Sequence, residues 1–196
     1  MIEYYREENF KTSKWSGGKT REILLLPEGS SYQERSFCIR LSSATIDVPS
    51  SRFTHLEGVK RFITPLSHPF LLEVNGTPPF LLCPFEVFQF SGSDVVQSYG
   101  MSVDFNLMLR EGRAEGWMKT LKPASTTSPL QSAEVCIALD KGYVFWIFSY
   151  RTAKILVNGT VQETEDCSFL MLKNIKEHIT LSSNQNIVYG CIKPII

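Results

Sequence analysis

The sequence lacks the features typical of membrane, secreted and nucleic-acid-binding proteins. Its 20 Lys and Arg residues are balanced by 20 Asp and Glu residues, whereas nucleic-acid-binding domains normally carry a basic excess on one face. The longest apolar runs, such as Pro79–Phe85 and Tyr143–Phe148, are far too short to cross a bilayer. The chain opens with the charged and polar segment Met1–Phe10 and not with a basic stretch followed by an apolar one. We therefore expect a cytoplasmic protein that binds neither nucleic acid nor membrane.

Motifs for common catalytic and metal sites are also missing. The five cysteines form no Cys-x-x-Cys pair, which excludes a zinc knuckle or a thioredoxin-like motif. The three histidines, His55, His68 and His178, have neither His-x-His nor His-Glu-x-x-His spacing. The sequence has no Gly-x-Ser-x-Gly elbow of the kind that serine hydrolases use. We expect no metal and no cofactor, and we favour a binding role over an enzymatic one.

One segment imitates a phosphate-binding loop. Gly17-Gly18-Lys19-Thr20 resembles the end of a P-loop, but Ser13 stands where that motif requires its first glycine. The flanking residues also do not predict the strand and helix that such a loop joins. We therefore do not expect nucleotide binding here.

The residues that are abundant predict strands. β-Branched and aromatic residues recur in segments bounded by Gly, Pro, Asn and Ser. Only Met101–Glu111 and Met171–His178 could hold a short helix. Because 43% of the residues are hydrophobic, the chain can bury a core. We expect an all-β fold with few short helices, and the expected strands are Ser36–Ile46, Phe70–Val74, Pro84–Phe90, Glu134–Leu139, Gly142–Tyr150, Lys154–Val157 and Ile187–Ile192.

Two Asn-Gly pairs, at residues 75–76 and 158–159, predict tight turns. Asn-Gly readily takes the positive φ angles of a type I′ hairpin turn. A two-residue loop at 158–159 would pair Leu156 with Val161 and Lys154 with Glu163, an apolar pair and an ion pair.

The two turns also indicate an internal duplication. Val74-Asn75-Gly76-Thr77 recurs as Val157-Asn158-Gly159-Thr160, at a separation close to half the chain length. Residues 119–132 are rich in Ser, Thr and Pro and are typical of a linker. We expect two similar halves, residues 1–118 and 133–196, that form one compact unit.

Four polar residues in apolar stretches are the candidate site. Arg40 lies in the strand-like run Phe37–Leu41, Arg61 precedes an apolar pair, and Asp104 and Asn106 flank a phenylalanine. One interpretation is structural: Asp104 and Asn106 cap a turn or short helix, and the arginines form ion pairs at the rim. The other is a pocket in which the arginines clasp a carboxylate while Asn106 and Asp104 orient the rest of the ligand.

At these residues the sequence resembles the HutD/Ves family of bacterial proteins. The first block is Trp15–Glu22, and the second joins Arg40–Ala44 to Phe53–Arg61. The third, Gly100–Arg110, contains the Asp-Phe-Asn-x-Met pattern after a glycine that is a hallmark of the family. The resemblance implies a cupin-like double β-barrel (a bicupin). It also implies binding of a small acid such as formylglutamate, in histidine utilisation, or a stress-related role.

The sequence departs from the family pattern at three points. Phe37-Cys38-Ile39 replaces the usual aromatic residue directly before Arg40, and Leu56-Glu57 stands where Phe-Pro is typical. Lys60 replaces a common acidic residue, so the contribution of that acid in relatives does not carry over.

Three functions follow from these observations. The leading hypothesis is a metal-independent, regulatory protein that binds a small carboxylate through Arg40, Arg61, Asp104 and Asn106. The first alternative is a metal-dependent cupin enzyme, an isomerase or dioxygenase, against which the poor supply of histidine counts. The second is a ligand-free interaction module, in which the 12% of aromatic residues furnish a homodimer face.

Overall fold

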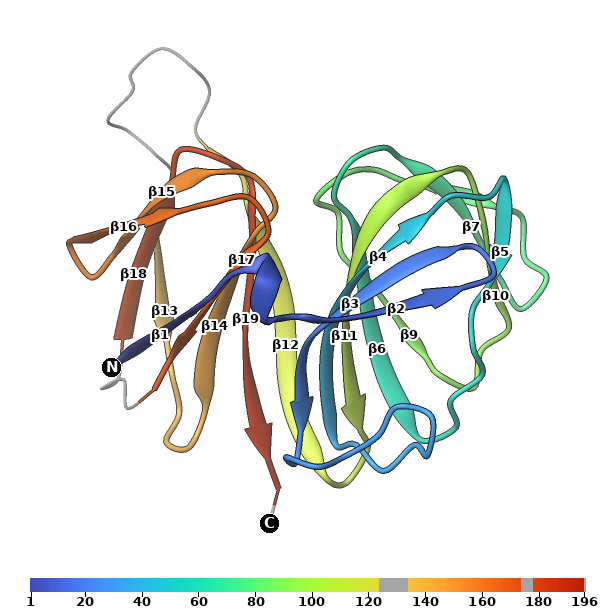
Figure 1. Cartoon of the computed structure of the whole chain (residues 1–196), viewed down its shortest axis with the longest axis horizontal. Coiled ribbons are helices and arrows are strands. Elements are labelled where there is room, and N and C mark those ends of the chain that lie inside the picture. The colour runs from blue at the N-terminus through green and yellow to red at the C-terminus, as the bar shows by residue number, and fades with distance from the viewer. Residues whose placement is uncertain (124–133, 174–177, 196) are drawn as a thin grey trace. The chain divides into compact units, whose positions relative to one another are not determined.

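A computed structural model describes residues 1–123, 134–173 and 178–195, and within them the chain is almost wholly β-strand (Figure 1). A single 3-10 turn, η1 (Glu7–Asn9), interrupts the strands of this described part. None of the described helical segments is long and apolar enough to span a membrane. The expectation of an all-β chain is therefore confirmed.

The chain folds into two compact units. The N-terminal unit comprises Phe10–Glu115 and Pro194–Ile196, and the C-terminal unit comprises Met1–Asn9 and Gly116–Lys193. The first nine residues thus join the second unit, and one strand runs across the expected boundary at residue 118. Of the expected linker 119–132, residues 124–132 lie outside the described residues.

The N-terminal unit consists of two antiparallel sheets. Its core lies between them and is built by inward-facing residues such as Ile63, Phe70, Leu72 and Phe90. The larger sheet has the order β2 (Lys11–Trp15), β3 (Gly18–Leu26), β4 (Ile39–Ile46), β11 (Ser102–Arg110), β6 (Val59–Pro65), β9 (Phe88–Ser91). The smaller sheet has the order β5 (Ser50–Arg52), β10 (Val96–Tyr99), β7 (Phe70–Val74), β8 (Phe80–Leu82).

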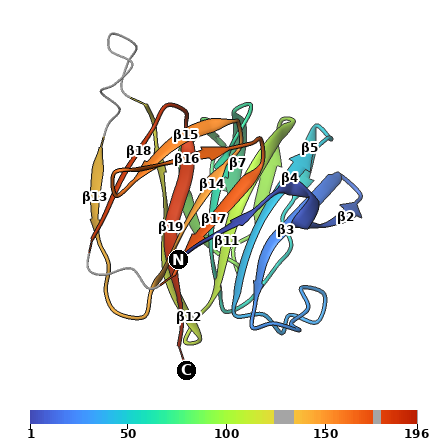
Figure 2. The same cartoon turned by 60° about the vertical axis from the view of Figure 1, so that its left-hand side comes forward.

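The C-terminal unit also has two sheets, which can be followed in Figure 2. The larger has the order β1 (Ile2–Tyr5), β17 (Ser168–Leu172), β14 (Val144–Ser149), β19 (Ile187–Pro194), β12 (Ala114–Leu121). The smaller has the order β13 (Val135–Ala138), β18 (His178–Ser183), β15 (Ala153–Val157), β16 (Thr160–Thr164). Among the described residues the pairings of both units form open sheets, so the expected closed barrels are not seen.

The pairing order confirms the internal duplication. The eight strands β4–β11 recur in the same arrangement as β12–β19. Thus β6 pairs with β9 and β11, and its counterpart β14 pairs with β17 and β19. Likewise β7 pairs with β8 and β10, as β15 pairs with β16 and β18.

The two Asn-Gly turns make the same contacts. Asn75 and Asn158 have φ angles of 52° and 48°, in the left-handed region. The backbone N–H of Asn75 donates to the Val95 carbonyl, and its Oδ1 accepts from the Val95 N–H, both at 2.8 Å. Asn158 makes the same pair of bonds to Thr180, at 3.0 and 2.8 Å. An asparagine at each turn therefore ties two strands of the smaller sheet together.

The predicted hairpin at residues 158–159 is confirmed in register. Leu156 pairs with Val161 and Lys154 with Glu163. The Lys154 ammonium lies 3.1 Å from the Glu163 carboxylate, on the exposed face of the hairpin.

The helix expected within Met101–Glu111 is wrong, because these residues form β11. Strand β11 lies between β4 and β6 in the centre of the larger sheet, where both ladders satisfy its backbone groups. Asp104 and Asn106 therefore do not cap a helix or turn. Gly17-Gly18-Lys19-Thr20 leads into strand β3 and not into a helix, unlike a phosphate-binding loop.

Candidate ligand-binding site

Three central strands bring all four predicted residues onto one face of the sheet. Met108 on β11 lies opposite Arg40 on β4 and Arg61 on β6, so these three side chains form a row across the sheet. Asn106 and Asp104 follow at intervals of two on β11, and alternate residues of a strand share a face. This face also carries Ile63 and Phe90 of the core, so the polar set lies on the inner side of the unit. All four predicted residues are buried.

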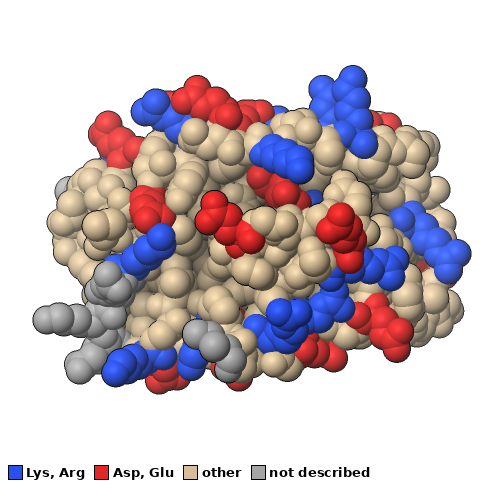
Figure 3. Space-filling model, turned by 60° about the horizontal axis from the view of Figure 1, so that its bottom comes forward, with Lys and Arg blue, Asp and Glu red and all other residues tan. Residues whose placement is uncertain are grey.

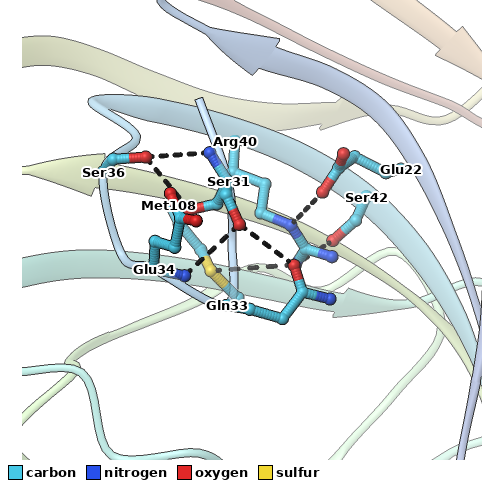
Figure 4. Close-up of polar contacts among 8 residues, drawn as sticks. All are labelled: Glu22, Ser31, Gln33, Glu34, Ser36, Arg40, Ser42 and Met108. Carbon is cyan, nitrogen blue, oxygen red and sulfur yellow. Dashed lines mark hydrogen bonds and ion pairs between the residues drawn. The ribbon is translucent and has the colours of Figure 1, made fainter. Parts of the chain in front are cut away.

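Arg40 is held by four groups, of which Figure 4 draws Glu22, Ser42 and Met108. Its Nε donates to the Glu22 carboxylate at 3.1 Å, and its Nη1 donates to the Ser42 hydroxyl at 3.0 Å and reaches the Met108 sulfur at 4.0 Å. The guanidinium carbon lies 4.1 Å from the centre of the Tyr32 ring, a cation–π contact. Arg40 also lines the pocket described below, so it is ion-paired and at the same time within reach of a ligand there.

A β-bulge places the counter-ion of Arg40. The pairing of β3 with β4 shifts between Glu22 and Leu24, so that Glu22 lies opposite Ser42 and Leu25 lies opposite Arg40. The extra residue keeps both Glu22 and Leu25 on the inner face, which a regular strand would not do. Sequence reasoning missed Glu22, because no local pattern signals such a bulge.

Arg61 has no such counter-ion among the described residues. Its guanidinium carbon lies 5.4 Å from the Phe53 ring centre and 4.9 Å from that of Phe90, and its Nη1 donates to the Thr54 carbonyl at 3.1 Å. Its Nε is buried without a partner in the described chain, and the residue lines the pocket described below. Burial lowers the pKa of Arg61 to about 10, so the side chain remains a cation at neutral pH. The ion pair expected at the rim thus forms for Arg40 and not for Arg61.

Asp104 and Asn106 are joined by a hydrogen bond. The Asn106 amide donates to Asp104 Oδ1 at 2.8 Å, and the Ala44 backbone N–H donates to the same carboxylate. Burial raises the pKa of Asp104 from 3.8 to about 7, against the opposing effects of Arg61 and of these hydrogen bonds. Asn106 Oδ1 is buried and has no partner in the part of the chain described. The pair therefore keeps unused acceptor capacity beside the two arginines.

These residues line a pocket of about 390 Å³ within the N-terminal unit. Such a volume falls in the range of small-molecule sites. On the face drawn in Figure 3, basic and acidic side chains are interspersed, in keeping with the net charge of zero. The pocket differs, because its lining holds five cationic side chains and one carboxylate. The charged lining residues are Lys14, Arg35, Arg40, Arg52, Arg61 and Asp104, and the others include Ser13, Trp15, Tyr32, Gln33, Phe53, Thr54, Leu56 and Met108.

The loop between β3 and β4 forms one wall of the pocket. Its backbone folds on itself through bonds between Ser31 and Ser36, of which the Ser31 N–H to Ser36 hydroxyl bond is 2.8 Å (Figure 4). Arg110 ties this loop to the segment that follows β5, because it donates to the Arg35 carbonyl and to the Glu57 carbonyl, each at 3.0 Å. These wall residues were not predicted, since a loop gives no periodic signal.

The C-terminal unit has apolar side chains at the corresponding positions. Inward-facing Ile63 on β6 corresponds to inward-facing Ile147 on β14, and their partners across the ladder are Asn106 and Tyr189. Where β6 has Arg61, two residues earlier, β14 has Phe145, which is buried in its core. At these matched positions, the polar side chains are therefore found in the N-terminal unit and apolar or aromatic ones in the C-terminal unit.

The donor chemistry of the pocket does not fit a metal ion. Its lining contains one carboxylate and no histidine or cysteine. No group of three or more His, Cys, Asp or Glu residues comes together anywhere in the described chain. Guanidinium and ammonium groups instead provide hydrogen-bond donors and positive charge, the chemistry that recognises carboxylates.

Together, these observations describe an all-β protein whose two units share a strand order and whose N-terminal unit contains a pocket lined by cations. Residues 7–181 match the HutD family, and the chain belongs to that family. No curated protein is significantly similar to the sequence.

Solved structures share the fold over the whole chain. HutD from Pseudomonas fluorescens SBW25, determined in a formate condition, has a TM-score of 0.78 at 21% identity, with 100% of both chains covered. PA5104, a conserved protein of unknown function from Pseudomonas aeruginosa PAO1, has a TM-score of 0.75 at 19% identity, with the same coverage. The bacterial pirin YhhW from Escherichia coli, in complex with nickel(II), has a TM-score of 0.62 at 9% identity and again covers 100% of both chains.

Proposed function

We propose that this HutD-family protein binds a small carboxylate in the pocket of its N-terminal unit, without a metal ion, and acts as a regulatory protein. The observation that carries the proposal is Arg61, a buried cation that forms no ion pair among the described residues and whose Nε has no hydrogen-bond partner there. Asp104 stabilises its charge from a distance, and a carboxylate ligand in direct contact with the guanidinium would pair it, which matters because a buried charge is costly unless it is paired.

Arg40 supports the same ligand. It also lines the pocket, and it lies in the same row as Arg61, with Met108 between them. Two guanidinium edges that face one cavity can hold both oxygens of a carboxylate or the two ends of a longer acid. Asn106, through its unpartnered Oδ1, and the adjacent Asp104 would orient the remainder of the ligand.

The pathway assignment is a separate part of the proposal. Membership of the HutD family supports a role in histidine utilisation, and the acid that we propose for this role is of the formylglutamate type. The formate condition of the Pseudomonas fluorescens HutD structure concerns that protein, and formate is the smallest member of the same ligand class.

Titration calorimetry and thermal unfolding with formate, formylglutamate, urocanate, glutamate and histidine test the proposal. One acid should saturate the protein and raise its unfolding free energy, by about 2.7 kcal/mol at a ligand concentration of 100 Kd. Arg61→Met should weaken that acid at least thirtyfold, or by about 2 kcal/mol, because the partner charge is gone. Arg113→Gln, which removes an exposed cation outside the pocket lining, serves as the control.

Two results would contradict the proposal. The first is the absence of any response across the panel of acids. The second is binding that disappears when the protein is treated with a chelator and returns with added metal. If Arg61→Met and the wild type bound the acid with equal affinity, the acid would bind outside this pocket.

A further inference from the structure

The mouth of the pocket carries three cations that the binding of one carboxylate does not use. Lys14 comes from β2, Arg35 from the loop between β3 and β4, and Arg52 from β5, so three separate elements bring them to one cavity. All three residues are exposed. No ion pair between their side chains and a carboxylate is found in the described chain, although surface cations elsewhere, such as Lys154, have one.

The charge balance of the whole pocket leaves a surplus. Glu22 neutralises Arg40, and Asp104 is the one carboxylate of the lining. The five cations of the lining exceed Glu22, Asp104 and one carboxylate ligand by two positive charges, so the cations Lys14, Arg35 and Arg52 would still carry a surplus. In a chain with a net charge of zero, such a concentration of one sign in a concave site favours a ligand with more than one negative group.

The size of the cavity agrees with this charge count. At about 390 Å³ the pocket is several times larger than formate or acetate requires. Buried arginines line it at the inner end and exposed cations at the mouth, so a ligand that satisfied both would extend between them.

We propose that Lys14, Arg35 and Arg52 form a second anion subsite at the mouth of the pocket, so that the ligand is a dicarboxylate with one acid group on Arg40 and Arg61 and the other at the mouth. The inference rests on the proposed function, because the inner group is the carboxylate argued above. On this proposal, the residues that select the length and charge of the ligand are ones that the sequence did not single out.

Matched pairs of acids test the subsite. Succinate is compared with butyrate, glutarate with valerate and adipate with hexanoate, so that each pair differs by one terminal carboxylate on the same number of carbons. At 20 mM salt, at least one dicarboxylate should bind tenfold or more tightly than its matched monoacid. This ratio should shrink at 0.5 M salt, because exposed charges are screened more strongly than buried ones.

Variants of the mouth give a second measurement. The combined Lys14→Gln and Arg52→Gln variant should reduce the ratio between dicarboxylate and monoacid to less than threefold. Lys60→Gln removes an exposed cation of the same unit that lies outside the pocket lining, and it should keep the wild-type ratio. Both substitutions lie at exposed side chains, and circular dichroism and thermal unfolding verify that each variant is folded.

The outcomes separate this inference from the proposed function. If monoacids bind through Arg61 and every matched pair has a ratio near one, the mouth subsite is wrong and the proposed function stands. If the ratio exceeds tenfold but survives in the combined variant, the second acid group binds elsewhere and the assignment to Lys14 and Arg52 fails. If no acid of either kind binds, both the proposed function and the subsite are overturned.

Discussion

Asp104→Asn offers the most direct test of the electrostatics of the site. Asp104 is a buried carboxylate whose pKa is raised from 3.8 to about 7, mainly because burial disfavours the charged form. Asparagine has nearly the same shape and can still accept the hydrogen bond from the Ala44 N–H. The substitution therefore removes the titrating group and leaves the packing of β11 in place.

The size and sign of the effect follow from this pKa. The folded state binds the Asp104 proton more tightly than the unfolded state, so its contribution to stability is complete below pH 3.8 and is lost as the pH rises through about 7. A pKa raised from 3.8 to about 7 corresponds to about 4 kcal/mol. Between pH 5 and pH 8 the unfolding free energy of the wild type should fall by about 3 kcal/mol relative to Asp104→Asn.

Urea unfolding of both proteins at pH 5, 6, 7 and 8 measures this difference. Hydrogen exchange of the β11 amides reports the N-terminal unit separately, because a chain of two units need not unfold in one step. Glu28→Gln, which removes an exposed carboxylate of the same unit, should follow the wild type at every pH. Parallel pH profiles for the wild type and Asp104→Asn would refute the reasoning.

Three further substitutions probe the ion pair and the fold. Glu22→Gln removes the counter-ion of Arg40. The Arg40 guanidinium should then bind an added acid about fivefold more tightly, or by about 1 kcal/mol. Equal or weaker binding in calorimetry would mean that the acid does not reach Arg40. Gly190→Ala should cost about 2–3 kcal/mol in chemical unfolding, because its Cβ would meet the Trp146 ring and a backbone carbonyl. Gly159→Ala, at a positive φ in open space, should cost only about 1 kcal/mol, and an equal loss for both glycines would contradict the packing argument.

Much of the fold follows from local patterns in the sequence. The expected strand Phe70–Val74 is β7 itself, and Lys154–Val157 lies within β15. The Asn158-Gly159 turn also predicts the pairing of its strands, because a two-residue loop allows only one register between them. The helix expected within Met101–Glu111 was wrong, because this segment forms β11, whose residues are buried on both faces of the sheet. A central strand that is buried on both faces loses the alternation by which a strand is recognised.

The candidate site was predicted in part. The four polar residues stand out in the sequence because each interrupts an apolar stretch, and the structure brings all of them to one pocket. Glu22 and the three cations of the mouth were not predicted. A bulge places Glu22, a loop places Arg35, and edge strands place Lys14 and Arg52. None of these features gives a periodic pattern in the sequence.

The sequence by itself determines an all-β chain, its internal duplication and the residue types available for chemistry. These depend on the period of two along a strand and on turn residues, which act over a few positions. Only the tertiary structure decides that Arg40, Met108 and Arg61 form one row, and that Glu22 pairs with one arginine and leaves the other without a counter-ion. The physical reason is that register across strands and burial are set by contacts between residues far apart in the chain. The charge surplus of the pocket, on which both proposals rest, is a consequence of those contacts.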